Sequence, residues 1–295
     1  MSLSLTYIHK LYQHFNTVLR LSAKFALFPR NLLEISFILS TNLHLHLLYN
    51  KSVFKTSTSW EDSLSLIYHS KQWMETKQST YAFVKFIKPK VMAGKKVLDI
   101  GCGTGAALYY IAKTFPNTQF NGIDKSKNLI LLANQKLAKL EIANLKFNQG
   151  NLFRLKKLKQ IDGVVSLQTI SWVKELRKPM TQIFKKINPN WICMSGLFYE
   201  GDISCKTLVY DHSLEREVYY NTYSLKELNR ISNFYGYKLT KVKPFKIDID
   251  ISEPKNKDHM STFTIQIADS SDRLQISGPI LLNWYFVMIE KSNNS

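Results

Sequence analysis

Residues 97–105 read Val-Leu-Asp-Ile-Gly-Cys-Gly-Thr-Gly, an apolar run that passes directly into three alternating glycines. The run predicts a buried strand, and the apolar spacing over residues 106–113 predicts a helix. The glycines allow a sharp turn, because a Cβ would block both a positive φ angle and the close approach of a ligand. Such a turn places backbone N–H groups beside a pocket. The next apolar strand ends in Asp124, where a carboxylate can accept both hydroxyls of a ribose.

Two cofactor classes use this geometry. Gly101, Gly103 and Ala106 meet the relaxed dinucleotide fingerprint G-x-G-x-x-G/A. S-adenosylmethionine sites carry an acid at the strand end followed by G-x-G-x-G, and Asp99 with the three glycines up to Gly105 fits that stricter pattern. A dinucleotide needs a helix N-terminus free for pyrophosphate. S-adenosylmethionine presents an ammonium and a carboxylate, which explains the acid. We favour this cofactor over a dinucleotide and over an ordinary glycine-rich turn.

From about residue 70 to the C-terminus, the chain resembles the class I S-adenosylmethionine-dependent methyltransferases that act on small molecules. Gln149–Phe153 follows the third strand, Ile161–Gln168 reads as the fourth strand with its expected Asp, and Trp191–Phe198 reads as the fifth. The resemblance implies a Rossmann-like, doubly wound α/β fold with a seven-stranded mixed sheet. Strands over residues 239–251 and 281–289 would complete that sheet.

Two helices are predicted with their ends. Residues 180–187 are amphipathic and stop before Pro189. A second helix begins at Ser224, where Glu227 stands at the spacing of a capping box, and it ends at Gly236.

The resemblance also implies which residues bind S-adenosylmethionine. In the family, an acid after the third strand contacts the adenine amino group, and Asn151 stands in its place here. An amide oxygen can still accept that hydrogen bond, without the charge. The residues expected to bind the cofactor are Asp99, Gly101, Cys102, Gly103, Gly105, Asp124, Lys125, Gly150, Asn151, Leu152 and Gln168.

Catalysis requires mainly the alignment of acceptor and donor, and an acceptor of high pKa also needs a base. Residues 169–173 replace the hydrophobic-His-His segment of many relatives, which removes one frequent base. The loop after the fifth strand lies at the carboxyl edge of the sheet, where ligands bind. Glu200 and Asp202 in that loop are therefore candidate catalytic bases, and solvent-facing acids that cap a turn are an equal alternative.

The acceptor is expected under a helical lid near residues 64–88. His69 and Trp73 stand at i and i+4 and share one helix face, for acceptor binding or for ordinary packing. Aromatic side chains suit small organic acceptors. The candidate acceptor-binding residues are His69, Trp73, Trp172, Tyr199 and Tyr223.

The 295 residues suffice for one α/β domain with an extension. We expect a basic N-terminal extension over residues 1–60, helical or poorly ordered, and a methyltransferase domain over 61–295 with a hairpin insertion near 252–279. No apolar stretch reaches the ~18–20 residues of a membrane span, which predicts no stable membrane insertion. The cytoplasm is the expected compartment. The first 33 residues contain no acid, so targeting to an organelle is the alternative.

Three cysteines without CxxC spacing predict reduced, inert thiols and no metal site. The net charge of +18 raises RNA as a partner, but it rests on 33 lysines against 7 arginines, and arginine is the residue that clamps phosphates. The function predicted is methyl transfer to an oxygen or nitrogen of a small organic acceptor. An RNA methyltransferase, or a noncatalytic binding module with a methyltransferase fold, is the alternative.

Overall fold

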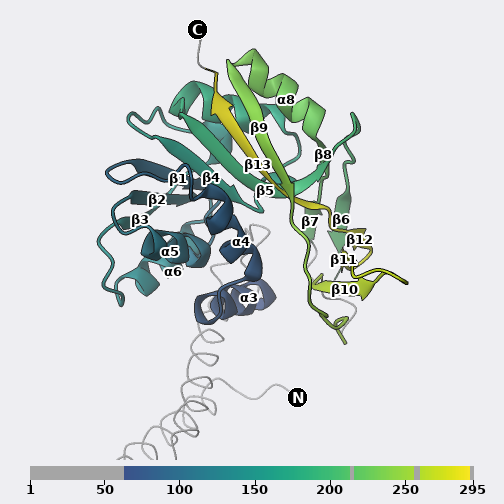
Figure 1. Cartoon of the computed structure of the whole chain (residues 1–295). Helices are drawn as coiled ribbons and strands as arrows, with labels where there is room; N and C mark the ends of the chain where they lie inside the picture. The colour runs from purple at the N-terminus through teal and green to yellow at the C-terminus, as the bar shows by residue number, and fades with distance from the viewer. Residues whose placement is uncertain (1–62, 213–215, 256–259, 293–295) are drawn as a thin grey trace, which may run out of the picture. The chain divides into compact units, whose positions relative to one another are not determined.

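A computed structural model describes residues 63–212, 216–255 and 260–292. Its centre is a sheet of seven strands in the order β3-β2-β1-β4-β5-β13-β9 (Figure 1). β13 runs antiparallel to both of its neighbours, and the pairs from β3 to β5 are parallel. The strands are β1 Lys96–Ile100, β2 Gln119–Asp124, β3 Leu145–Gln149, β4 Gly163–Leu167, β5 Trp191–Tyr199, β9 Tyr237–Pro244 and β13 Trp284–Lys291. The predicted mixed sheet is confirmed.

Helices cover both faces of this sheet. Side chains alternate between the faces of a strand, so in β1 Val97 packs against one set of helices and Leu98 with Ile100 packs against another. α4, α5 and α6 contribute to the first core, and α7 and α8 contribute to the second. The helices are α3 Ser63–Met74, α4 Gln78–Ile87, α5 Ala106–Thr114, α6 Lys127–Leu137, α7 Arg177–Gln182 and α8 Leu225–Phe234. The fold is therefore doubly wound.

Two details differ from the sequence-based expectation. The helix expected over residues 180–187 is α7 followed by a π-helical turn at Ile183–Ile187, and Asn188 ends it in the left-handed conformation at φ +50°. The strand expected over 239–251 stops at Pro244, because proline has no N–H to continue the ladder.

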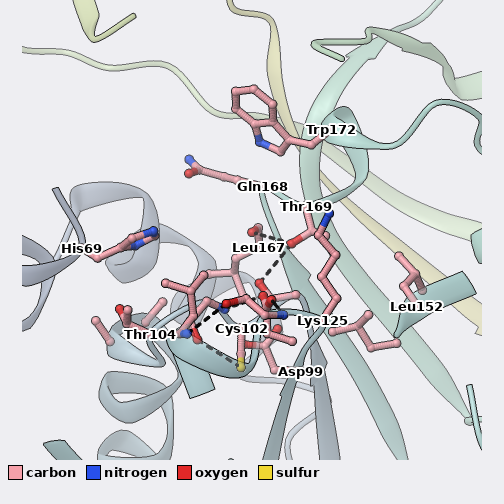
Figure 2. Close-up of a pocket in the computed structure, with 18 of the residues that line it drawn as sticks. His69, Asp99, Cys102, Thr104, Lys125, Leu152, Leu167, Gln168, Thr169 and Trp172 are labelled. Atoms are coloured by element: carbon pink, nitrogen blue, oxygen red, sulfur yellow. Dashed lines mark hydrogen bonds between the residues drawn. The ribbon is translucent and has the colours of Figure 1, made fainter. Parts of the chain in front are cut away.

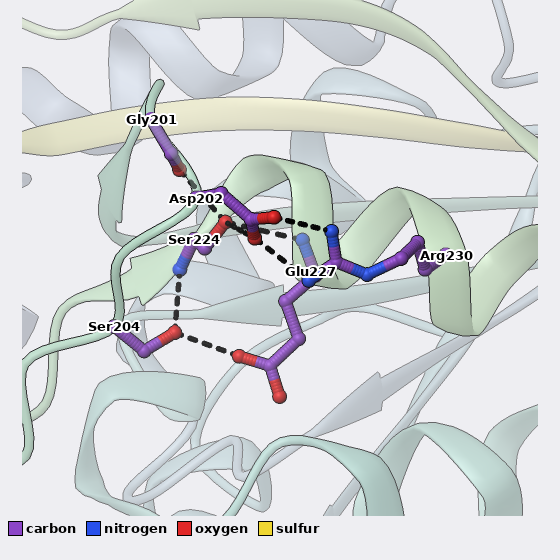
Figure 3. A network of polar contacts seen from close by, with 6 residues as sticks. All are labelled: Gly201, Asp202, Ser204, Ser224, Glu227 and Arg230. Carbon is purple, nitrogen blue, oxygen red and sulfur yellow. Dashed lines mark hydrogen bonds and ion pairs between the residues drawn. The ribbon is translucent and has the colours of Figure 1, made fainter.

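Ser224 caps the start of α8 as predicted, but the Glu227 side chain has a different partner from the one that a capping box requires. Ser224 Oγ accepts the N–H of Glu227 at 3.1 Å. The Glu227 carboxylate does not return to the Ser224 N–H and accepts instead from the Ser204 hydroxyl at 2.7 Å. That same hydroxyl accepts the Ser224 N–H at 2.9 Å (Figure 3). Ser204 therefore links the two ends of the predicted capping box.

Smaller strands lie outside the main path. The predicted insertion near residues 252–279 holds the hairpin β10 Thr262–Gln266 and β11 Arg273–Ser277, extended by β12 Ile280–Leu281. A hairpin of β6 Leu208–Asp211 and β7 Arg216–Tyr219, and the short β8 Tyr223–Ser224 beside β5, were not predicted.

The N-terminal part of the domain consists of two helices, α3 and α4, where one lid helix near residues 64–88 was expected. The predicted extension over residues 1–60 lies outside the described residues and stays a prediction. Among the helices that the structure describes, none is long and apolar enough to cross a membrane.

Candidate functional site

A pocket of about 270 Å³ lies at the carboxyl ends of the parallel strands (Figure 2). The strand order reverses between β1 and β4, and open α/β sheets bind ligands at such a switch point. The glycine turn after β1 and the segments after β2, β3 and β4 form one part of the wall, and α3 and α4 form another. Segments far apart in the sequence thus meet around one cavity.

The three glycines of the turn serve different purposes, although all have positive φ angles. A Cβ on Gly101 would overlap the Thr169 side chain, and one on Gly105 would overlap the Phe147 ring. A Cβ on Gly103 would meet only His69 Cε1, at 3.8 Å. Gly103 therefore leaves free space on the pocket side, where a ligand can approach the backbone. Gly105 does not line the pocket, and the Phe147 ring leaves no room for a Cβ there, so packing explains this glycine.

Asp124 connects the end of β2 to the glycine turn. Its Oδ2 accepts the N–H of Gly103 at 3.0 Å, and its Oδ1 accepts the N–H of Ser126 at 2.9 Å. Asp124 also lines the pocket, so these two bonds fix the orientation of a carboxylate in the pocket wall.

Asp99 is an acid inside the pocket wall with only 2% of its surface exposed. Its Oδ1 has no hydrogen-bond partner among the described residues. Burial, and secondarily the charge of Asp124, raises the pKa of Asp99 to about 8. An unsatisfied carboxyl oxygen beside a ligand pocket fits an ammonium donor, because that charge would favour the ionised acid.

Figure 2 shows Lys125, directly after β2, and Leu152, after β3, on the side of the pocket opposite to His69. Gly150 and Asn151 belong to the same wall. The Asn151 side-chain oxygen accepts the N–H of Phe153 at 2.9 Å and caps a 3-10 turn. An amide oxygen can accept a second hydrogen bond, so this contact does not use its full capacity.

Gln168 lies at the end of β4 in a left-handed conformation, at φ +58°. Its N–H donates to the carbonyl and hydroxyl oxygens of Ser195, both at 3.0 Å. A non-glycine residue held at positive φ by surrounding bonds is typical of functional sites. Gln168 lines the pocket, and Figure 2 places it between the glycine turn and Trp172.

Two of the predicted acceptor-binding residues, His69 and Trp172, line the pocket. Figure 2 shows them on different sides of the space above the glycine turn. Trp172 packs edge-on against Tyr220, with ring centroids 4.2 Å apart. This part of the pocket therefore has an aromatic wall from the β4 side and a polar wall from α3.

The other three predicted acceptor contacts lie elsewhere. Trp73 donates its indole N–H to the Thr104 carbonyl at 3.1 Å, which attaches α3 to the glycine turn. Tyr223 is buried beneath the pocket segment, and its hydroxyl donates to the Val173 carbonyl. Tyr199 is 47% exposed and does not line the pocket. These residues support the wall or face solvent.

The two predicted catalytic acids are also outside the pocket. Asp202 forms a two-point ion pair with Arg230, at 2.7 and 2.8 Å, on an exposed surface (Figure 3). This pair lowers the pKa of Asp202. Glu200 is exposed and accepts a hydrogen bond from the Tyr285 hydroxyl at 3.4 Å. The alternative interpretation, surface acids at a turn, describes both, because the chain after β5 turns away from the pocket.

Cys102 lies in the pocket wall with a buried thiol whose pKa is raised, by burial first and then by the charges of Asp99 and Asp124. Burial also raises the pKa of Cys193. Both thiols are therefore neutral at pH 7. No group of three or more metal-ligating side chains occurs in the described part of the chain.

The pocket residues that were not predicted include a group around α3 and α4, one residue after β4 and one on β5. These are Tyr68, Gln72, Lys77, Ser79, Thr80, Thr169 and Ser195. No local motif marks them, since their position depends on how α3 and α4 pack over the sheet.

Comparison with known proteins gives the same fold and class. Residues 92–238 match a family model described as a methyltransferase domain. A (S)-tetrahydroprotoberberine N-methyltransferase from Eschscholzia californica is 29% identical over 128 residues, which cover 43% of this chain and 35% of the relative. A malonyl-[acyl-carrier protein] O-methyltransferase from Priestia megaterium is 25% identical over 142 residues, covering 46% and 51%.

The chain thus spans from about a third to a half of the length of these curated relatives. Among solved structures, a Burkholderia thailandensis 1,6-didemethyltoxoflavin-N1-methyltransferase has a TM-score of 0.52 and 12% identity, covering 78% of this chain and 85% of that one. This likeness concerns the fold alone. Taken with the family model, the chain belongs to the class I S-adenosylmethionine-dependent methyltransferases, and S-adenosylmethionine is its cofactor.

Proposed function

We propose that this chain transfers a methyl group from S-adenosylmethionine to an oxygen or nitrogen of a small organic acceptor. One observation carries the proposal: the cavity beside the glycine turn continues to the residues of α3 and of the segment after β4. Cofactor and acceptor would thus share one cavity, as alignment of the two requires.

The cofactor residues have separate roles in this proposal. The open backbone at Gly103 admits the cofactor, and Asp124 accepts its ribose hydroxyls. Asp99 receives the ammonium, and Asn151 accepts from the adenine amino group. When bound, S-adenosylmethionine supplies an electrophilic methyl group on a positively charged sulfur.

On the acceptor side, the role of the protein is to position the acceptor beside the methyl group. Trp172 offers a flat apolar surface, and Trp73 holds α3 against the glycine turn. His69 is the imidazole of the described pocket wall, and an imidazole can accept a proton near pH 7. We assign to it the role of base for acceptors that must lose a proton.

Two measurements in sequence test the proposal. Calorimetry should first show binding of S-adenosylmethionine and none of NAD. Incubation of the protein with a metabolite extract and methyl-labelled cofactor should then label a small molecule, with RNase making no difference. If the protein bound NAD and not S-adenosylmethionine, the function would be that of a dehydrogenase. Cofactor binding without any labelled product would favour a noncatalytic binding module.

An RNA acceptor is a second candidate, because Lys156, Lys157 and Lys159 are exposed directly after the 3-10 turn at Leu152–Arg154. Label in RNA that RNase removes would support this candidate.

A further inference from the structure

The residues at the start of α4 form a polar group in the pocket that the cofactor assignment does not use. We propose that Lys77 and Thr80 bind a carboxylate of the methyl acceptor, so that the acceptor is a small organic acid. This inference rests on the proposed function and narrows its substrate class.

Lys77 is a cation in the pocket wall without an acidic partner. Its Nζ donates to the Tyr68 hydroxyl and to Gln168 Oε1, the latter at 3.5 Å, and lies 4.6 Å from the centre of the Tyr68 ring. No carboxylate among the described residues lies within ion-pair distance of it. These contacts hold the ammonium in place but leave its positive charge uncompensated. A bound anion would therefore meet a positioned charge and form a charge-assisted hydrogen bond with it.

The side chain of Lys77 is not needed to form α4. Lys77 is the N-cap residue, and its backbone carbonyl accepts the N–H of Thr80 at 2.9 Å, but its side chain makes no capping bond. The first turn of α4 contains no acid. Capping of α4 therefore does not require a lysine at this position.

Thr80 adds a hydroxyl to the same part of the pocket wall. The residue is only 3% exposed and lines the pocket, and its hydroxyl has no hydrogen-bond partner among the described residues. Its oxygen is not one of the fully buried atoms that lack a partner, so the hydroxyl is open to the pocket. A carboxylate held by Lys77 beside the first turn of α4 would accept from this hydroxyl, and the N-terminus of a helix favours a negative charge.

The charges of the pocket select an acid over a neutral or basic acceptor. The acids of the described wall, Asp99 and Asp124, belong to the glycine turn and the end of β2. A cationic acceptor beside Lys77 and the positively charged sulfur would be repelled, whereas a carboxylate is attracted to both charges.

The cofactor also has a carboxylate, and the position of Lys77 favours the acceptor as the source. Lys77 contacts Tyr68 and Gln168. Figure 2 places Gln168 between the glycine turn and Trp172, and Trp172 packs against Tyr220. Lys77 therefore contacts a residue on the path to the aromatic end of the pocket.

The test uses the whole chain saturated with S-adenosylhomocysteine. Saturation-transfer NMR would measure the binding of matched acid and amide pairs: benzoate with benzamide, phenylacetate with phenylacetamide, and indole-3-acetate with indole-3-acetamide. We expect at least one acid to bind about tenfold more tightly than its amide, the ratio for a hydrogen bond to a charged group. Lys77→Gln should remove that preference, and Thr80→Val should reduce it about threefold. Lys85→Gln changes an exposed lysine of α4 and should have no effect.

A second experiment distinguishes binding of the acceptor carboxylate from binding of the cofactor carboxylate. Calorimetry would compare S-adenosylhomocysteine with 5′-methylthioadenosine, which lacks the carboxylate, in wild type and Lys77→Gln. We expect the affinity ratio of these two ligands to be the same in both proteins. A ratio that shrinks in the variant would overturn the inference, because Lys77 would then bind the cofactor. It would equally be overturned if no acid binds or if the amides bind as well. Failure of S-adenosylhomocysteine to bind the wild type would instead refute the proposed function.

Discussion

The two halves of the pocket are built differently. On the cofactor side, the glycine turn and the ends of β1, β2 and β3 come from the single stretch of residues 99–151. On the acceptor side, residues of α3 and α4 meet residues after β4 and Ser195 of β5. A site built from one stretch around a glycine turn leaves a recognisable motif, whereas a site built from distant segments leaves none. Each prediction below tests this contrast.

The largest effect on cofactor binding should follow a change at Gly103. In Gly103→Val the new side chain would enter the pocket, so cofactor binding should fall by more than about a hundredfold, equivalent to about 3 kcal/mol. Gly94→Val is the matched control, since Gly94 has φ +71° and open space around a Cβ. Both variants bear the strain of a positive φ angle, and calorimetry should show a loss of binding in Gly103→Val alone. Equal binding in the two variants would remove Gly103 from the site.

Asp99 should make the fold less stable as the pH rises. Its pKa is raised from the ordinary value of 3.8 to about 8, so the folded protein retains a proton that the unfolded chain loses between these values. The stabilising contribution of that proton is complete below pH 4 and is lost as the pH rises through 8. Asp99→Asn cannot ionise, so at pH 8 it should exceed wild type in free energy of unfolding by up to about 5 kcal/mol.

Urea unfolding at pH 5 and pH 8 measures this difference. Asp202→Asn is the control, because Asp202 is exposed, pairs with Arg230 and has a lowered pKa. The same ionisation links Asp99 to the cofactor: calorimetry in two buffers of different ionisation enthalpy should show proton release on binding near pH 7, absent from Asp99→Asn. A wild type that binds without proton release would contradict the ammonium contact.

Asp124 tests whether a side chain on the cofactor side acts on the ligand or only on the backbone. Asp124→Ala should weaken adenosine-containing ligands by about 1–3 kcal/mol, the range for hydrogen bonds to a charged group. The carboxylate also accepts from Gly103 and Ser126, so a loss of affinity alone is ambiguous. Wild type should therefore prefer adenosine to 2′-deoxyadenosine, and Asp124→Ala should lose that preference. An unchanged preference would mean that Asp124 only positions the turn.

The contrast also explains what the sequence could predict. Asp99, Gly103 and Asp124 stand at fixed places relative to a strand and a turn, and all three line the pocket as expected. Glu200 and Asp202 stand at a plausible sheet edge, but the chain direction after β5 is set by long-range packing, which no local pattern encodes. Lys77 carries no motif, because its position depends on the break between α3 and α4.

The smallest effect is expected at the exposed lysines after the 3-10 turn. The segment 155–159 alternates between apolar and basic residues. Leu155 is buried and Leu158 is half-buried in the core, whereas the three lysines, Lys156, Lys157 and Lys159, are exposed. Here the apolar residues fix the segment and the lysines face solvent, so neutralising all three to Gln should leave folding and cofactor binding unchanged.

With a small acceptor, activity of this triple variant should remain near that of wild type and depend weakly on salt. With an RNA acceptor, several phosphates would be neutralised, and apparent affinity would fall by orders of magnitude between low and moderate salt. Methyl transfer measured in wild type and variant at two salt concentrations separates the cases. A large loss of activity in the variant, together with a steep salt dependence of the wild type, would move the acceptor site out of the pocket and onto this basic surface.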